Sequence, residues 1–285
     1  MSPDPSPTVK RRRMGIELRK LREAAGLTLE QVGEEMEWSR SKVSRIENAR
    51  VVLRARDVGD LCELYNATGE QREMLIRLAR QAKEKGWWAP YSDAIPDWFE
   101  IYVGLEAEAK SLRNYEAEFV PGLLQSREYA SALHRASMVS ATTEEIERQV
   151  DVRMARQEFL RRPGAPRLWT VLNEAVIRRP VGSRDDMVDQ LRHLVETAKS
   201  LPNLTLQVLP FQSGAHPAML GAFMILEFPE AGDRDVVYLE NVAGGLYLEK
   251  PSETERYALI FDHIRMKALD QDDSLKLIEK AARDL

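Results

Sequence analysis

The sequence predicts an α+β protein, with an all-α N-terminal part and a C-terminal part that mixes helices and strands. Apolar residues recur with the helical period, between start and stop signals, through the first 85 residues. Short β-branched and aromatic runs, typical of strands, come only later. Residues 86–97, rich in Trp and Pro, break both patterns and are the best candidate linker. With 285 residues, the chain has room for two domains.

Five short helices are expected between residues 14 and 85. Capping residues, Gly and apolar spacing place them at about 14–25, 28–36, 39–48, 57–65 and 68–84. The second begins with a capping box, in which the Thr28 hydroxyl caps the backbone N–H of Gln31 and the Gln31 side chain reaches back. Residues 1–13 precede the helices and are expected to form a disordered leader with a basic end.

The second domain, residues 98–285, is expected to combine strands and helices without a regular βαβ order. Strands are predicted at about 115–120, 168–172, 204–210, 222–228, 236–240 and 246–249. Helices are predicted at about 97–112, 125–137, 143–162, 185–200, 253–269 and 274–284.

Composition excludes several classes of protein. Hydrophobic residues at 44% and charged residues at 31% are typical of a globular protein. No apolar run approaches the roughly 20 residues of a membrane span, and the N-terminus lacks the apolar core of a secretory signal. The single cysteine, Cys62, cannot form an internal disulfide and is expected to be a buried, inert thiol. We therefore expect a cytoplasmic protein with no membrane partner.

The net charge of −5 hides an asymmetry. Residues 1–85 hold 18 Lys+Arg against 14 Asp+Glu, a balance of +4, and the remainder holds 23 against 32, a balance of −9. Residues 10–13 form one basic block, and residues 39–56 carry six basic side chains against one acid, Glu47. Such local concentration is what phosphate binding needs.

The predicted third helix has two unlike faces. Ser44, Arg45 and Asn48 fall within about 60° of Ser41 at the helical period, and two branched aliphatic residues, at 43 and 46, fall opposite. The aliphatic side would anchor the helix, leaving the polar side free to enter the major groove of DNA, which admits one α-helix.

Length and charge separate the roles of the candidate DNA contacts. Arg45, long and central on the polar face, is the first choice for a bidentate contact to guanine. The other candidates for base edges are Arg40, Ser41, Lys42 and Ser44. Helix starts and flanking arginines would instead position phosphates. These candidates are Thr28, Gln31, Ser39, Arg50 and Arg54, with Arg11, Arg12 and Arg13 as an arm along the backbone or in the minor groove.

The stretch RKLREAAGLTLEQVGEEMEWSRSKVSRIENAR resembles the helix-turn-helix of the lambda-repressor-like (XRE) regulators. The likeness runs through LR..RE..GLT, Gly33 and S.S.VSRIEN. It implies that the third helix approaches DNA and that Asn48 supports a phosphate contact. Two positions depart from the family, which usually has Gly at both: Glu37 in the turn and Ala49 after the Asn. Glu37 must then adopt a left-handed conformation, at a cost of roughly 1 kcal/mol.

Residues 115–250 resemble a C-terminal domain of unknown function that follows such modules in many actinobacterial regulators. The motifs are EAEFVPGLLQSREYASAL, RMARQEFL, VLNEAVIRRPVG, QLRHLVETA, LQVLPF..GAHPAMLGAF.ILEF and VVYLE. Genes of that family often lie beside one that encodes a small protein, so the resemblance implies a control pair. It implies neither a reaction nor a ligand.

Three polar residues of this part, Glu174, His216 and Glu240, would converge near two glycine-containing loops and form a ligand pocket. The alternative is structural, because a loop His is usually a surface or capping residue and strand glutamates usually face solvent. PGLLQ is interpreted as a turn into a helix, and the segment around Arg153 and Arg156 as an amphipathic packing helix.

No motif of an enzyme, a metal site or a cofactor site is present: HExxH, paired cysteines, GxSxG, a Walker loop and GxGxxG are all missing. We therefore predict no enzymatic activity, no metal and no cofactor.

Together these features predict a sequence-specific transcriptional regulator that binds double-stranded DNA at the nucleoid as a homodimer. Its C-terminal domain would dimerise, bind a small protein encoded by a neighbouring gene, or sense a ligand. Three alternatives stay open: an antitoxin-like protein that neutralises that neighbour and autoregulates, an enzyme carried on a DNA-binding domain, and a helical bundle whose charged stripe is merely solvated.

Overall fold

The computed structural model describes residues 7–82, 86–91, 93–229 and 233–285. The chain divides into two compact units, Met1–Ala89 and Pro90–Leu285. The division lies inside the segment 86–97 that breaks the helical pattern.

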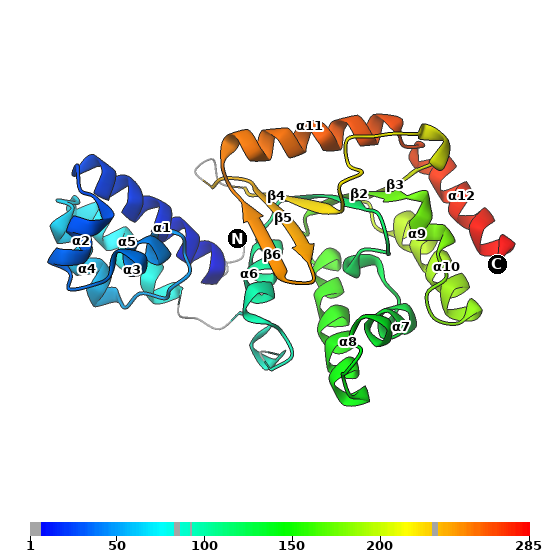
Figure 1. Ribbon diagram of the computed structural model, residues 1–285, viewed down its shortest axis with the longest axis horizontal. Coiled ribbons are helices and arrows are strands. Elements are labelled where there is room, and N and C mark those ends of the chain that lie inside the picture. The colour runs from blue at the N-terminus through cyan, green and yellow to red at the C-terminus, as the bar shows by residue number, and fades with distance from the viewer. Residues whose placement is uncertain (1–6, 83–85, 92, 230–232) are drawn as a thin grey trace. The chain divides into compact units, whose positions relative to one another are not determined.

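The first unit contains the five expected helices (Figure 1). They are α1 (Pro7–Ala24), α2 (Leu29–Glu35), α3 (Arg40–Glu47), α4 (Ala55–Leu64) and α5 (Gly69–Gln81). Their first boundary differs from the prediction, because α1 already includes residues 7–13 of the expected disordered leader. Proline suits the first position of a helix, and Lys and Arg are good helix formers, so the basic block extends α1. Residues 1–6 of the leader lie outside the described residues.

The predicted capping box of α2 is present. Thr28 Oγ1 accepts from the Gln31 backbone N–H at 3.2 Å, and Gln31 Oε1 accepts from the Thr28 N–H at 2.8 Å. Thr68 and Gln71 form the same pair of bonds at the start of α5. Local sequence signals therefore fix where these two helices begin.

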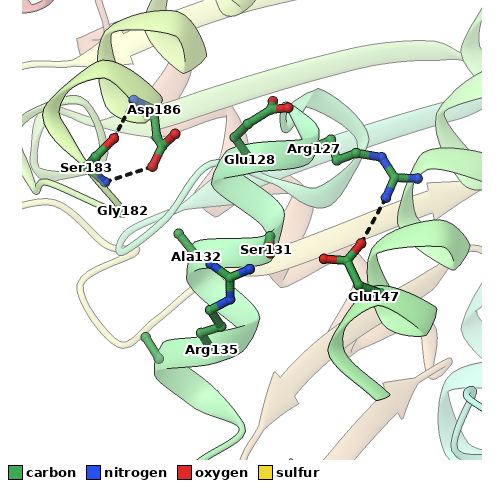
Figure 2. Close-up of a pocket in the computed structure, with 10 residues that line it drawn as sticks. Arg127, Glu128, Ser131, Ala132, Arg135, Glu147, Gly182, Ser183 and Asp186 are labelled. Carbon is green, nitrogen blue, oxygen red and sulfur yellow. Dashed lines mark hydrogen bonds and ion pairs between the residues drawn. The ribbon is translucent and has the colours of Figure 1, made fainter. Parts of the chain in front are cut away.

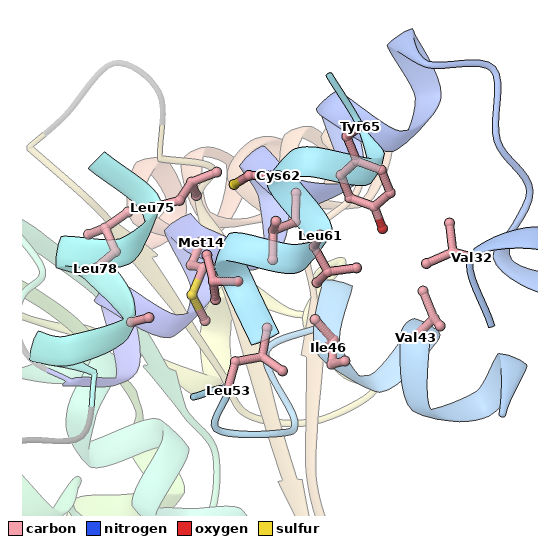
Figure 3. Close-up of a cluster of buried hydrophobic side chains, with 13 residues drawn as sticks. Met14, Val32, Val43, Ile46, Leu53, Leu61, Cys62, Tyr65, Leu75 and Leu78 are labelled. Carbon is pink, nitrogen blue, oxygen red and sulfur yellow. The ribbon is translucent and has the colours of Figure 1, made fainter. Parts of the chain in front are cut away.

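One hydrophobic core holds the five helices together (Figure 3). Its buried side chains come from all of them and include Met14, Leu18, Val32, Val43, Ile46, Leu53, Val58, Leu61, Cys62 and Leu75. Cys62 is only 1% exposed, and burial raises the pKa of its thiol, so it is the inert core residue that the sequence predicts.

The second unit is built on a six-stranded mixed sheet. The strands are β1 (Ser111–Glu116), β2 (Arg167–Asn173), β3 (Leu204–Leu209), β4 (Phe223–Glu227), β5 (Val236–Asn241) and β6 (Gly244–Leu248). Their spatial order is β3-β2-β1-β4-β5-β6. The first three strands run parallel, whereas β4, β5 and β6 each pair antiparallel to their preceding neighbour in that order. The fold is the mixed α+β arrangement that the sequence predicts.

Helices cover both faces of this sheet (Figure 1). They are α6 (Asp97–Glu106), α7 (Arg127–Ser137), α8 (Thr143–Gln157), α9 (Glu174–Arg178), α10 (Arg184–Ser200), α11 (Pro251–Lys267) and α12 (Gln271–Asp284). Helix α11 crosses one face, where Phe261 and Ile264 pack with Tyr115, Val171 and Val237. On the opposite side lie α6, α7 and α8, and α10 packs against α12 beside β3.

The first strand lies four residues earlier than expected. We predict a strand at 115–120 and a helix to residue 112, but β1 spans Ser111–Glu116 and α6 ends at Glu106. The reason is that β1 is central, between β2 and β4, with both faces covered. Leu112 and Tyr115 are buried on opposite faces, so the strand lacks the polar–apolar alternation of a half-exposed strand. Among the described residues, no helix has the length and apolar character required to cross a bilayer.

Candidate nucleic-acid interface

Helix α3 is fixed to its unit by its apolar side. Ser39 caps the N-terminus, where its Oγ accepts from the backbone N–H of Lys42 at 3.2 Å. Val43 and Ile46 are 1% and 2% exposed and pack in the core with Val32, toward which Val43 points (Figure 3). The other side of the helix is thereby turned away from the core.

This outward side carries the residues predicted to read bases. Ser41 and Arg45 are exposed, and Ser44 is half-buried. Within the described part of the chain, no hydrogen bond, ion pair or ring contact engages the Arg45 side chain. Arg45 can therefore extend into a groove without first breaking an internal bond.

Two basic residues at the start of α3 are engaged by the protein itself. Arg40 Nε lies 2.5 Å from Glu30 Oε1 of α2, with both side chains exposed. Lys42 Nζ lies 3.6 Å from the centroid of the Trp38 ring, a cation–π contact. Exposed ion pairs contribute little stability, so Arg40 can exchange Glu30 for a phosphate or a base at small cost.

The one acid of the 39–56 stretch is turned inward. Glu47 Oε1 lies 2.6 Å from Arg22 Nε of α1, and the Glu47 side chain is only 7% exposed. Arg22 also donates to Glu47 Oε2 at 3.1 Å and to the Leu27 carbonyl at 2.7 Å. The hydrogen bond to Glu47 raises the pKa of the Arg22 guanidinium. This buried pair ties α1 to the end of α3 and removes a negative charge from the outward face.

The three predicted phosphate contacts at helix starts are exposed but already bonded. The side chains of Thr28 and Gln31 form the capping box of α2. Ser39 Oγ lies 3.0 Å from Ser41 Oγ. A phosphate role for these residues stays a prediction.

The remaining phosphate candidates separate into two groups. Arg50 and Arg54 are exposed and follow α3 directly. Asn48 donates from Nδ2 to the Ser44 carbonyl at 2.8 Å and so closes the end of the same helix. By contrast, residues 11–13 (Arg11, Arg12, Arg13) belong to α1, so the extended arm expected there is a helix.

The helices α2 and α3 are each followed by a residue in the left-handed conformation that is not glycine. Glu37 has φ 53°, and the Trp38 N–H donates to the Gly33 carbonyl at 2.7 Å, as in a Schellman motif. Ala49, which follows α3, has φ 57°. The left-handed conformation that the sequence predicts for Glu37 is confirmed, and Ala49 shares it.

Replacing Glu37 and Ala49 with glycine is expected to stabilise the first unit. Relief of the left-handed strain outweighs the extra chain entropy of glycine, so each change should add about 0.5–1 kcal/mol to the free energy of unfolding. Urea unfolding followed by circular dichroism measures this. The matched control is Glu73→Gly at an exposed position within α5, which should cost about 1 kcal/mol. Destabilisation by Ala49→Gly would contradict the prediction.

Comparison with known families identifies both units. A helix-turn-helix domain matches residues 13–75. A domain of unknown function (DUF5753) matches residues 99–280, more than half of the chain. The chain belongs to the DUF5753 family. No curated protein and no solved structure matches it. The two matches confirm both resemblances drawn from the sequence, and the helix-turn-helix domain supports a DNA-binding regulator.

The residues predicted to form a ligand pocket in the DUF5753 domain have separate surroundings. Glu174 is held in structural bonds: its Oε1 accepts from Arg178 Nε at 3.2 Å and its Oε2 from the Phe211 backbone N–H at 2.9 Å. His216 stands edge-on to the Tyr115 ring, with the ring centroids 5.7 Å apart.

Glu240 belongs to the other face of the sheet. Tyr115 packs on the α11 side together with Val237 of β5. Because side chains alternate along a strand, Tyr238 and Glu240 point to the opposite face, where the Tyr238 hydroxyl donates to Glu240 Oε2 at 2.9 Å. The structure therefore does not bring Glu240 together with His216. The sequence prediction missed this because it does not reveal which strand faces share a layer.

A surface cavity of about 660 Å³ lies between α7, α8 and the start of α10 (Figure 2). Three of its charged side chains, Arg127, Glu147 and Asp186, are already bonded to neighbours. Arg127 pairs with Glu147 at 3.3 Å and with Asp151 at 2.5 Å, and Ser183 and Asp186 form the capping box of α10. No cluster of three or more His, Cys, Asp or Glu among the described residues could hold a metal ion.

One set of buried charges in the DUF5753 domain was not anticipated from the sequence. Arg156 of α8 donates to Glu106 of α6 through two bonds of 3.0 and 2.8 Å, and the Tyr102 hydroxyl donates to the same carboxylate at 2.7 Å. Glu106 and Arg156 are 2% and 6% exposed. The segment interpreted as a packing helix thus carries an ion pair into the interior. Its signal was two arginines three residues apart, at 153 and 156, on a helix expected to be buried.

Proposed function

We propose that this chain is a sequence-specific transcriptional regulator that reads operator DNA through the outward face of α3. The observation that carries the proposal is the accessible, unengaged Arg45 on a helix whose opposite side is locked in the core. Arg45 would bond the O6 and N7 atoms of a guanine, with Ser41 and Ser44 beside it. Arg40 and Lys42 would contact base edges or phosphates at the start of the helix.

Phosphates would be held around this helix. Arg50 and Arg54 supply charge, and Thr28, Gln31, Ser39 and Asn48 supply polar groups at helix ends. Contacts of this kind fix the register of the protein on the duplex without reading the sequence.

The proposal includes a homodimer. One recognition helix reads few base pairs, so two copies would bind half-sites about 34 Å apart, one turn of the duplex. The DUF5753 domain would hold the copies together and couple DNA binding to a ligand or to a small protein encoded nearby.

The Arg45→Ala variant tests the groove assignment. Selection from a random DNA library first identifies the operator, which should contain two symmetric half-sites. Binding to single-base variants is then measured by fluorescence anisotropy. Arg45→Ala should lose about 1–3 kcal/mol of discrimination at one guanine position and keep its selectivity elsewhere.

Two controls separate base reading from general attraction. Arg50→Ala should weaken binding to all sequences alike and reduce the salt slope by about one. Arg77→Ala, an exposed arginine of α5 with no assigned DNA contact, should change neither. Unchanged selectivity in Arg45→Ala would refute the assignment of α3 to the groove.

A further inference from the structure

Several segments of the DUF5753 domain bring polar side chains to the sheet face opposite α11. Asn114 and Glu116 come from β1, and Glu240 comes from β5. They share this face because Tyr115, between the first two, packs with α11. We call Asn114, Glu116 and Glu240 the acceptor cluster.

The sheet register places Glu116 and Glu240 on either side of a small residue. Tyr115 pairs with Phe223 and Met224 pairs with Tyr238. Continued outward, the same register sets Ala222 between Glu116 and Glu240, two strand spacings or about 9–10 Å apart at the backbone. Ala222 is exposed and carries only a methyl group, so the strand between the two glutamates adds no large side chain on this face.

The side of Glu240 away from Ala222 is also built from a small residue. Glu240 pairs with Gly245 of β6. A Cβ atom at Gly245 would lie only 3.2 Å from the Trp98 ring of α6. The aromatic side chains of Tyr238 and Trp98 therefore lie on this side of the acceptor cluster.

The nearby arginines do not neutralise both glutamates. Arg156 is already paired with Glu106. Arg153 Nη1 donates to Gln125 Oε1 at 2.6 Å, and Gln125 is held in turn by a bond to the Val120 carbonyl. In the described part of the chain, neither carboxyl group of the acceptor cluster belongs to an ion pair. Arg153 lies within electrostatic reach of both glutamates and Arg156 of Glu240, but neither arginine bonds a carboxyl group of the acceptor cluster.

The Asn114 side-chain oxygen lacks a hydrogen-bond donor among the described residues. It is 2% exposed, and its Nδ2 donates to Glu116 Oε1 at 3.2 Å and to the Phe223 carbonyl at 3.3 Å. Its Oδ1 atom is buried and accepts no hydrogen bond from the described residues. An unsatisfied buried acceptor is costly, and it lies beside a carboxyl group that also lacks a cation.

We propose that the acceptor cluster binds a small organic amine, with its ammonium group between Glu116 and Glu240 and within reach of Asn114. An ammonium group supplies the donors and the positive charge that these three residues lack. An anion would meet two acidic side chains and the unsatisfied Asn114 oxygen, and a metal ion would find too few ligands among the described residues. A role for this amine as an effector rests on the proposed regulator function, whereas its binding does not.

Calorimetry on the full chain at pH 9, where Glu116 is ionised, tests the proposal with three probes of similar length: 1,4-diaminobutane, 1,4-butanediol and succinate. Only the diamine should bind. Glu116→Gln and Glu240→Gln should each weaken it about tenfold or more, because each removes a charged acceptor. The matched control is Glu118→Gln, an exposed glutamate that pairs with Arg179 and should leave binding unchanged.

The pH dependence gives a second signature. Burial, together with the charge of Glu240, raises the pKa of Glu116 to about 8, against the lowering effects of Asn114 and Arg153. Tyr129 of α7 also faces this carboxyl group. A cation favours ionised Glu116, so affinity should rise from pH 6 to pH 9, where an aliphatic amine, like that of lysine with a pKa of about 10.4, stays charged. Glu116→Gln should flatten this rise.

Three outcomes would overturn the proposal: binding of succinate in place of the diamine, equal diamine affinity in Glu116→Gln, or binding of none of the three probes. Arg45→Ala should bind the diamine like the unaltered protein. Failure of the DNA-binding proposal would therefore leave this measurement intact, and the reverse also holds.

Discussion

Replacing Arg22 with methionine is expected to lower the free energy of unfolding of the helix-turn-helix unit by about 3–5 kcal/mol. The substitution leaves Glu47, 7% exposed, as an unpaired buried carboxylate at the end of α3. Small domains have only about 5–15 kcal/mol in total, so a large part of their stability would be lost. Because α3 carries the proposed recognition face, operator binding should weaken in parallel. Urea unfolding and anisotropy measure the two effects.

The matched control lies on the same helix. Arg19 pairs with Glu23 at 2.8 Å, but both side chains are more than half exposed. Arg19→Met should therefore cost no more than about 0.5 kcal/mol. If Arg22→Met unfolded at the same urea concentration as the unaltered chain, the buried pair would not be the link between α1 and α3.

The second large effect is expected in the DUF5753 domain. Arg156→Met removes the bidentate partner of Glu106 and should cost about 3–5 kcal/mol. A buried ion pair can often be replaced as a whole by apolar side chains, so the double variant Glu106→Leu with Arg156→Met should recover most of that loss. Thermal unfolding of the single and double variants measures the difference.

An exposed arginine of the same helix provides the control here. Arg148 bonds Asp93 at 3.2 Å, with both side chains well exposed. Arg148→Met should shift the melting temperature little. A double variant as unstable as Arg156→Met alone would show that the desolvated pair is not the source of the loss.

The features that could be predicted from the sequence are local ones. The capping boxes of α2 and α5, the inward aliphatic side of α3 and the left-handed Glu37 each depend on residues a few positions apart. Patterns of this range follow from helix geometry and from backbone sterics alone. The recognition-helix candidates are placed on one face for the same reason.

Features that depend on distant residues could not be predicted. Arg22 and Glu47 lie 25 positions apart, and Glu106 and Arg156 lie 50 apart. The sequence around one member of each pair does not show that a partner of opposite charge lies beside it in the fold. The same holds for Glu240, because its neighbours depend on the strand order rather than on the strand itself. The predicted start of α1 is too late because the prediction treats the basic block at residues 10–13 as an arm rather than as part of the helix.

Strand β3 is at the edge of the sheet, and the chain that follows α11 covers this edge. Val208 donates from its backbone N–H to Ser274 Oγ at 2.9 Å, and its carbonyl accepts from the Leu269 N–H at 2.9 Å. A free strand border is a template for aggregation. Helix α12 (Gln271–Asp284) and the residue segment before it thus cover this edge and protect it from pairing with another strand. A chain shortened before α12 would keep every strand of the sheet. It would nevertheless expose the β3 edge, through which copies could pair and aggregate.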